Sequence, residues 1–390
     1  MPSVTPLKRI HMDNNATTPV DPVVLESMMP FLGVRFGNPS SLHEEGRIAR
    51  AALDDARDRV AQAVGCPPRE IVFTSGGTES NTLALRGVVR KALVGGKKTP
   101  VHIVTTRVEH SSILETVRLM EEEGLVAATF VGVDSRGRLN LAELESALTQ
   151  ETVLVSVMAV NNEIGNIYPI EEIGRLTHLR GILFHVDACQ ALGKIRLNLK
   201  NLPVDLASFS AHKISGPKGV GALSIRQGAA VGAIQRGGAQ EFEKRGGTEN
   251  LPGIVGFGTA ITQAHGNLET ESTRVGVLRD RLEQGFRERI SGVHMHGDLG
   301  LRVSNTLNVS FEGIARETIL VAMDRAGIAA SAGSACASGA LEPSHVLLAM
   351  GLDRAFAKGA VRFSLGRSVT EPDIDSVIEI MTEIVKRLRS

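Results

Sequence analysis

Short apolar runs that alternate with helix-like segments are the feature that most constrains the fold of this chain. The runs occupy residues 71–73, 101–104, 153–157, 182–186 and 206–209. Segments such as 45–64 and 111–122 lie between them and carry apolar residues three or four positions apart, which is helical spacing. Short, continuously apolar strands separated by helices are typical of a mostly parallel sheet that helices cover on both faces. The sequence therefore predicts an α/β fold.

The last third of the chain has a different pattern. Apolar residues from Val275 to Ile290 predict a long amphipathic helix, and residues 306–311 alternate like a strand. A helix at 317–326, a strand at 361–365 and a closing helix at 374–388 are expected to follow. We predict a large domain over residues 15–255 and a smaller α/β domain over residues 1–14 and 256–390, which a chain of 390 residues can accommodate.

An aspartate and a lysine follow two of the apolar runs. Asp187 comes directly after the run 182–186, and Lys213 comes shortly after 206–209. Pyridoxal phosphate needs a lysine amine for its Schiff base and a carboxylate that keeps the pyridine nitrogen protonated. A buried carboxylate also needs a partner, so a structural arginine or a helix N-terminus is the alternative for Asp187. An ordinary surface lysine is the alternative for Lys213.

Phosphate-binding candidates lie near these residues. Gly77 and Thr78 follow the run 71–73 and open a predicted helix, where backbone N–H groups can bind an anion. The alternative is a simple turn in which Thr78 caps the helix. Ser210 and His212, beside Lys213, can serve the same phosphate.

Other polar residues at strand ends are candidates for the rest of a site. His110 can stack on a flat ring and move protons, or it can be a structural histidine. Asn162 can bind a cofactor hydroxyl or a substrate carboxylate, or belong to a turn closed by Gly165. Arg362 can hold a carboxylate with two hydrogen bonds, or form a structural ion pair.

The three cysteines have different settings. Cys336 lies among Ser, Ala and Gly, which predicts a mobile, exposed loop and a thiol that is reactive if its thiolate is stabilised. The alternative is an incidental exposed thiol. Cys66 and Cys189 look structural by comparison. With three cysteines and no CxxC pair, neither a disulfide framework nor a metal site is predicted.

Charge and hydropathy exclude several function classes. The chain has 43 basic and 43 acidic residues and no long basic run, so we expect no nucleic-acid or membrane partner. The first residues form no apolar segment, and no stretch reaches about 18 consecutive apolar residues. We expect a soluble, cytoplasmic protein.

Taken together, these segments resemble the cysteine desulfurases of the NifS/IscS type, which are class-V, fold-type I pyridoxal-phosphate enzymes. The matching segments are 13–19, 37–41, 75–81, 109–110, 161–165, 185–190, 208–213, 245–250, the Cys336 loop, 341–345 and 362–367. The resemblance implies a large domain with a mostly parallel seven-stranded sheet. It also implies a smaller C-terminal α/β domain that carries a mobile catalytic loop at about 328–342.

The resemblance also implies residue roles. Lys213 carries pyridoxal phosphate, Asp187 pairs with the pyridine nitrogen, Gln190 binds the ring hydroxyl and His110 stacks on the ring. The phosphate contacts are assigned to Gly77, Thr78, Ser210, His212 and, from the other subunit of a homodimer, Thr248. The substrate carboxylate is assigned to Asn38, Asn162 and Arg362, and Asn162 also contacts the cofactor. Cys189 stands where the family more often has Thr, Ala or Val, which puts a second thiol near the cofactor.

The implied reaction converts L-cysteine to L-alanine. Lys213 removes the Cα proton, and Cys336 takes the sulfur as a persulfide for an acceptor such as an iron–sulfur scaffold protein. A thiol pKa of ~8.5 leaves little thiolate at neutral pH, so a base or cation is required, for which His110 is the candidate. The alternatives are a selenocysteine lyase, another pyridoxal-phosphate lyase or aminotransferase, and, from another class, a non-catalytic assembly subunit.

Overall fold

The computed structural model describes residues 9–333 and 343–390. Its larger sheet has seven strands in the order β2-β8-β7-β6-β5-β3-β4. Strand β8 runs antiparallel to both of its neighbours, and the other pairs are parallel. The strands are β2 (Ile71–Thr74), β3 (Val101–Thr106), β4 (Val126–Val131), β5 (Thr152–Met158), β6 (Leu183–Asp187), β7 (Leu206–Ser210) and β8 (Gly221–Ile225). The predicted mostly parallel sheet is confirmed.

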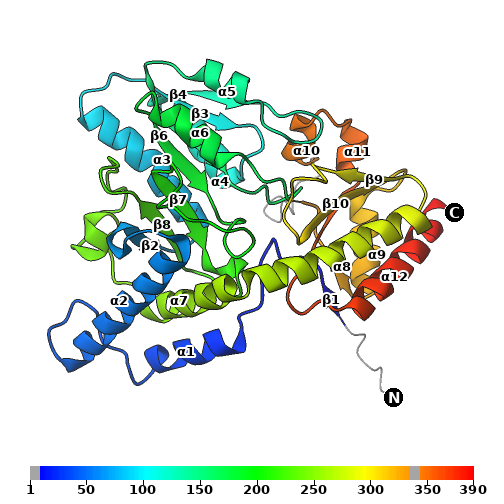
Figure 1. The fold of residues 1–390 in the computed structure, drawn as a ribbon, viewed down its shortest axis with the longest axis horizontal. Helices are drawn as coiled ribbons and strands as arrows, with labels where there is room; N and C mark the ends of the chain where they lie inside the picture. Colours follow the sequence, from blue (N-terminus) through cyan, green and yellow to red (C-terminus); the bar gives the residue numbers. More distant parts are fainter. Residues whose placement is uncertain (1–8, 334–342) are drawn as a thin grey trace.

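Helices cover both faces of this sheet, as Figure 1 shows. They are α1 (Pro22–Leu32), α2 (Glu44–Val64), α3 (Gly77–Val94), α4 (Ser111–Glu122), α5 (Leu141–Ala147), α6 (Ile170–His178) and α7 (Leu251–Gly266), with short 3-10 turns η1 (Pro68–Glu70), η2 (Ala211–Lys213) and η3 (Gln240–Glu243). Successive residues of a strand point to opposite faces. Accordingly, Phe73 packs in one buried cluster with Leu53 of α2, and Val72 packs in another with Leu83 of α3.

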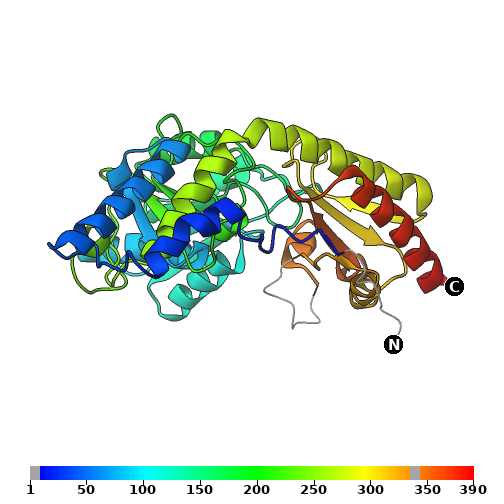
Figure 2. The same cartoon turned by 90° about the horizontal axis from the view of Figure 1, so that it is seen from below.

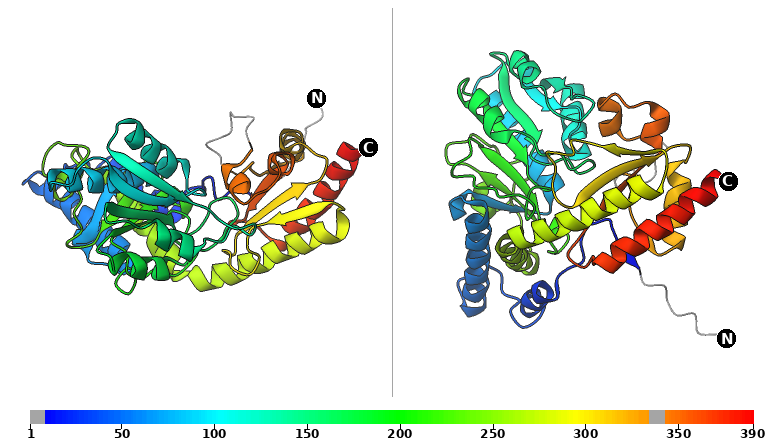
Figure 3. Two further views of the ribbon diagram at one scale, coloured as in Figure 1. Left: turned by 90° about the horizontal axis from the view of Figure 1, so that it is seen from above. Right: turned by 45° about the vertical axis from the view of Figure 1, so that its right-hand side comes forward.

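A second, smaller lobe contains a three-stranded antiparallel sheet in the order β12-β10-β9. Its elements are α8 (Leu268–Arg289), β9 (Val293–His296), β10 (Thr306–Phe311), α9 (Arg316–Arg325), β11 (Ile328–Ala329), α10 (His345–Ala349), α11 (Arg354–Lys358), β12 (Ala360–Ser364) and α12 (Glu371–Arg389). Strand β1 (Ile10–His11) pairs in parallel with β11. Phe286, Phe311 and Phe363 meet edge to face in a separate buried cluster. Helices α8 and α12 lie side by side over it (Figure 3).

The two lobes meet along the N-terminal segment and the α7–α8 connection (Figure 2). The expected domain boundary near residue 256 falls inside α7. That helix belongs to the first core along its length, from Leu251 to Ala264, and the second core begins at Val275 of α8. We therefore propose the boundary between α7 and α8, near Asn267. None of the helices within 9–333 and 343–390 is both long and apolar enough to cross a membrane.

Candidate active site

Polar side chains from separate strand ends meet at one edge of the large sheet. Asp187 ends β6, Ser210 ends β7, and Lys213 follows in η2. Open α/β sheets place their ligands at this edge because the carboxyl ends of parallel strands gather there. A cavity of about 190 Å³ opens at this point. The predicted residues on its wall are Gly77, Thr78, His110, Asn162, Asp187, Gln190, Ser210, His212, Lys213 and Arg362.

Two predicted residues, Asn38 and Thr248, are not among those that line this wall. Asn38 is exposed, and its Oδ1 accepts a hydrogen bond from the Ser40 N–H at 2.9 Å. Thr248, which was assigned to the site of a partner subunit, is exposed as well. Cys336 and most of the expected loop at 328–342 lie outside the residues that the structure describes.

Asp187 is 7% exposed and has only neutral donors among the hydrogen bonds found for it. Its Oδ2 accepts from Asn81 Nδ2 at 2.8 Å, and its Oδ1 accepts from the Cys189 N–H at 3.0 Å. A carboxylate has about four acceptor positions, so Asp187 can still accept the N–H of a protonated ring. The buried Asn81 Oδ1 has no hydrogen-bond partner within the described part of the chain. This wall fits the pyridine nitrogen of pyridoxal phosphate.

A hydrogen-bonded chain leads from Asp187 to His110. Asn81 Nδ2 also donates to Ser112 Oγ at 2.8 Å, and this hydroxyl lies 2.9 Å from His110 Nδ1. The Ser112 backbone N–H donates to the same Nδ1 at 3.1 Å. A backbone N–H can only donate, so Nδ1 is an acceptor and the neutral ring carries its proton on Nε2. Burial lowers the pKa of His110, which favours this neutral form.

His110 also has the structural role that the sequence left open. It is the N-cap of α4, because its Nδ1 accepts the N–H of the second residue of that helix. This capping bond and the site are compatible, since the same bond fixes the imidazole on the cavity wall.

The start of α3 forms a cradle for an anion. The first N–H groups of a helix have no partner inside the helix, and the helix dipole favours negative charge there. Any side chain at Gly77 would place its Cβ 2.6 Å from Cys189 Sγ, so only glycine fits against this wall. The N-cap of α3 is Gly76, so the alternative in which Thr78 caps the helix is wrong. Thr78 is instead free to line the cavity together with Ser210 and His212, which suits the phosphate of the cofactor.

The amine of Lys213 is directed by the N-terminal segment. Its Nζ donates to the carbonyl oxygens of Asn15 at 2.6 Å and Ala16 at 2.9 Å. This segment is tied to β12, because the Asn14 N–H donates to the Ser364 carbonyl at 3.1 Å and the Asn15 N–H donates to Ser364 Oγ at 2.9 Å. Residues from both ends of the chain therefore position the lysine.

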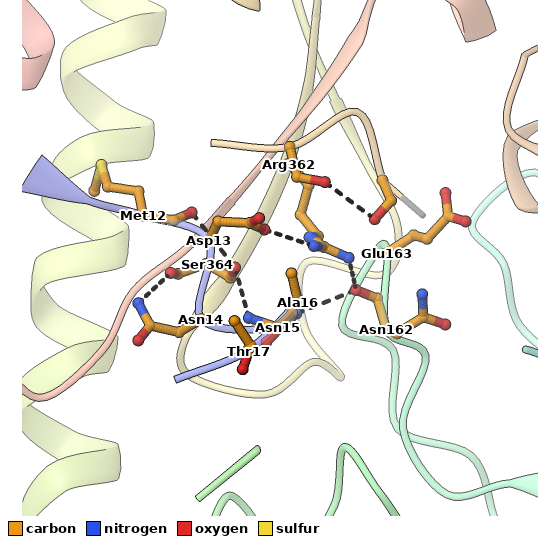
Figure 4. A network of polar contacts seen from close by, with 12 residues as sticks. Met12, Asp13, Asn14, Asn15, Ala16, Thr17, Asn162, Glu163, Arg362 and Ser364 are labelled. Atoms are coloured by element: carbon orange, nitrogen blue, oxygen red, sulfur yellow. Dashed lines mark hydrogen bonds and ion pairs between the residues drawn. The ribbon is translucent and has the colours of Figure 1, made fainter. Parts of the chain in front are cut away.

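Arg362 projects from β12 and is 1% exposed. Its Nη1 donates to the Asn162 carbonyl at 2.9 Å, and its Nη2 donates to Asp13 Oδ1 at 2.7 Å (Figure 4). Arg362 Nε has no partner within residues 9–333 and 343–390. A guanidinium has five N–H donors, so this side chain retains donors for a carboxylate in the cavity.

Cys189 also lines the cavity. Burial, followed by the neighbouring Asp187 carboxylate, raises the pKa of the Cys189 thiol well above its ordinary value. Burial raises the pKa of Cys66 to about 11. A thiol with a raised pKa stays protonated and is a poor nucleophile, so neither cysteine is suited to attack sulfur.

Sequence reasoning gave no role to three residues that organise this site. Asn81 lies one helical turn after Gly77, on the same face of α3, and this spacing was a usable signal. Ser112 lies two residues after His110, where a side-chain cap is common. Asn15 gave no local signal, because its partners are Lys213, Thr306 and Asn305, all distant in sequence.

Comparisons with known proteins agree with this geometry. The profile of the family described as "Aminotransferase class-V" matches residues 10–377. A cysteine desulfurase from a Nostoc species is 48% identical over 381 residues, which cover 98% of this chain and 94% of that protein. A cysteine desulfurase IscS from Clostridium botulinum is 46% identical over 384 residues, covering 98% and 96% of the two chains.

Solved structures give the same result. A NifS-like protein superposes with a TM-score of 0.90 at 40% identity, covering 97% of this chain and all of that one. A NifS-like protein from Rickettsia africae gives 0.85 at 31% identity, covering 97% and 99%. The resemblance to NifS/IscS-type enzymes is confirmed, and the chain belongs to the class-V aminotransferase family of pyridoxal-phosphate enzymes.

Proposed function

We propose that this protein is a pyridoxal-phosphate-dependent cysteine desulfurase that converts L-cysteine to L-alanine and transfers the sulfur to Cys336. One observation carries the proposal: a single cavity joins the Lys213 amine, the Asp187 carboxylate and the anion-binding start of α3. Relatives that match almost the whole chain are named cysteine desulfurases.

Pyridoxal phosphate, when bound, withdraws electrons from the Cα of the amino acid attached to it. The residues of this chain hold and complement that group. Asp187 accepts the ring N–H, the first turn of α3 receives the phosphate, and His110 lies against the ring. Gln190 serves the ring oxygen. Each of these side chains already lies on the cavity wall.

Lys213 is the group that moves the Cα proton. The hydrogen bonds from its Nζ to the carbonyl oxygens of Asn15 and Ala16 hold the amine at the cavity where this proton is taken up. Arg362 and Asn162 orient the substrate by its carboxylate, using the guanidinium donors that Asp13 and the Asn162 carbonyl leave free. Charge-assisted bonds of this kind are directional as well as strong.

Cys336 is the proposed sulfur acceptor within the protein. Its thiolate attacks the sulfur of the substrate, so that an S–S bond forms and the substrate C–S bond breaks. The C–S electron pair stays with the carbon fragment, which takes up protons and leaves as alanine. The Nδ1 of His110 is occupied and its pKa is lowered, so His110 is proposed to stabilise the thiolate through Nε2–H donation and not as a cation.

A homodimer is proposed because an apolar surface is exposed on α1 and the segment after it. The large apolar side chains exposed there, from 49% to 91%, are Val23, Leu25, Met29, Leu32, Val34, Phe36 and Leu42. Clustered exposed apolar residues mark interaction surfaces. Asn38 lies in this segment and Thr248 is also exposed, so both are proposed to act on the cavity of the second subunit.

The sulfur is proposed to pass from Cys336 to an acceptor protein in the cytoplasm, such as an iron–sulfur scaffold. The similarity to enzymes of the IscS type supports this destination. Purified mixtures of this protein with candidate scaffolds and ³⁵S-labelled L-cysteine would identify the acceptor by transfer of the label.

The decisive experiment measures alanine and protein-bound persulfide from L-cysteine, with added pyridoxal phosphate and a reductant. Wild type is compared with Cys336→Ala, and Cys66→Ala is the matched control. We expect alanine from wild type and from Cys66→Ala only, with the persulfide mapped to Cys336. Equal turnover by Cys336→Ala would favour a lyase or aminotransferase. A wild type that binds the cofactor without turnover would favour a non-catalytic assembly subunit.

A further inference from the structure

A second lysine lies beside the cavity and has no part in the reaction described above. Lys194 follows β6 by seven residues, and its Nζ donates to Asn15 Oδ1 at 2.8 Å and to Gln190 Oε1. Both acceptors are neutral amide oxygens. The charged groups that act on this amine are Lys213 and Arg362, and together with burial they lower the pKa of Lys194 well below its ordinary value. Burying a lysine amine against neutral partners costs free energy of folding. The effects of this amine fall on its two partners, Asn15 and Gln190.

The first effect is on the orientation of the Gln190 amide. Its Oε1 accepts from Lys194, and its Nε2 donates to the Asn15 carbonyl at 2.9 Å. Turning the amide over would place its NH₂ group against the amine of Lys194 and its oxygen against a carbonyl oxygen. The contacts with the Asn15 carbonyl and with Lys194 together select this orientation. In that orientation the second N–H of Nε2 remains available on the cavity wall.

The second effect is on Asn15, which accepts hydrogen bonds from four side chains. Its carbonyl accepts from Lys213 Nζ and Gln190 Nε2, and its Oδ1 accepts from Lys194 Nζ and from Asn305 Nδ2 at 3.0 Å. Lys194 thus contacts Asn15, whose carbonyl directs Lys213, and Gln190, which is assigned to the ring oxygen. Lys194 and Lys213 also line a second opening, between α8 and the N-terminal segment.

We propose that Lys194 is a positioning residue that holds Gln190 as a hydrogen-bond donor toward the ring hydroxyl oxygen of bound pyridoxal phosphate. This inference rests on the proposed function, because it needs the cofactor in this cavity. A hydrogen-bond donor toward the ring oxygen favours negative charge there. It therefore favours the less protonated form of the linkage between the cofactor and Lys213. Loss of Lys194 should raise the pH at which that linkage takes up a proton.

The test is a pH titration of the visible absorption of the purified holoprotein. Lys194→Met removes the amine but keeps an unbranched side chain, and Lys194→Gln restores a neutral donor. We expect the midpoint to rise by about one pH unit in Lys194→Met and by less in Lys194→Gln. Lys200→Met, at an exposed lysine, is the matched control and should titrate like wild type.

A Lys194→Met protein that binds the cofactor and titrates at the wild-type midpoint would overturn the inference. So would loss of cofactor binding in a variant whose cofactor-free form melts at the wild-type temperature, since Lys213 and Asp187 should still hold the cofactor. If Lys194→Met does not fold, Gln190→Met removes the same donor and must show the same rise. When Lys194→Met and Gln190→Met are combined, the rises in the titration midpoint should not add, because both substitutions remove the same hydrogen bond.

This experiment separates the inference from the proposed function. A wild type that neither binds pyridoxal phosphate nor consumes L-cysteine contradicts the proposed function directly. A wild type that does both, beside an unshifted Lys194→Met, contradicts only the role given to Lys194.

Discussion

The two sides of the cofactor cavity are built in different ways. On the side of the large sheet, Asp187 is the last residue of β6, and His110 and Lys213 closely follow β3 and β7. On the other side, Arg362 comes from β12 of the small lobe and is held by Asp13 and by the Asn162 carbonyl of the large lobe. The first side, which is proposed to bind the cofactor, belongs to the large lobe except for the Asn15 and Ala16 carbonyls that hold Lys213. The second side, which is proposed to bind the substrate, forms only where the two lobes and the N-terminal segment meet.

The largest expected effect is on the side of the large sheet. Lys213→Ala removes the amine that moves the Cα proton, so alanine formation should fall by roughly a thousandfold. Melting temperature should change little, because the side chain is only partly buried. The measurement is alanine release from L-cysteine, with Lys200→Ala as the control. Retention of a tenth of wild-type activity would mean that another group moves the proton.

A smaller effect is expected on the side of the small lobe. Arg362→Lys cannot reproduce the planar fork of donors, so KM for L-cysteine should rise by roughly ten- to a hundredfold. Affinity for pyridoxal phosphate should stay within about twofold of wild type if the two sides are independent. Arg367→Lys, at an exposed arginine, should change neither quantity. A parallel loss of cofactor affinity in Arg362→Lys would show that the two sides are coupled.

Glu109 gives the large lobe its own pH dependence. Burial raises the pKa of this carboxyl to about 8, so the folded state binds a proton that the unfolded state loses near pH 4.5. The resulting stability is present at low pH and is lost as the pH rises from about 4.5 to 8. Glu109→Gln should remove this loss, which is on the order of 5 kcal/mol. Melting curves of both proteins across this range test it, and parallel curves would contradict it.

His296 gives the small lobe the opposite and smaller dependence. Burial lowers the pKa of this imidazole to about 4, and its Nε2 pairs with Ser310 Oγ at 2.7 Å. The contribution of His296 to stability is therefore present above the pKa of the unfolded state, near 6.5, and is lost as the pH falls toward 4. His296→Asn should flatten this acid limb by on the order of 3 kcal/mol. Unfolding measured with one probe in each lobe would show whether the pH dependences assigned to Glu109 and His296 occur in different lobes. If His296→Asn loses stability at low pH as wild type does, His296 is not the source of that loss.

Much of the large lobe could be predicted because local patterns determine it. The helix expected at 111–122 coincides with α4, and the strand expected from Leu206 begins where β7 does. Asp187, His110 and Lys213 were found because each follows such a strand. Helix α1 was not predicted, although Asp21 caps it and Pro22 opens it, a usual helix start.

Other features depend on contacts that no local pattern reveals. Asn81 and Asp187 are 106 positions apart, and Lys194 and Asn15 are 179 apart. We propose a later domain boundary than the sequence predicted, because α7 carries small residues that let α2 of the large lobe approach closely. A Cβ on Gly258 would lie 2.9 Å from Ala56 Cα. That packing depends on the partner helix and not on the periodicity of α7.

The Lys213 amine rests on residues 15 and 16, and Asn15 is held by Ser364, 349 positions later in the sequence. During synthesis, the first residues leave the ribosome long before the strand that secures them. The large sheet has all of its strands by residue 225, yet its lysine still lacks a secured set of carbonyl acceptors. The site around Lys213 is therefore finished only after β12 has been made, and a nascent chain that captures the cofactor earlier holds it without a secured lysine.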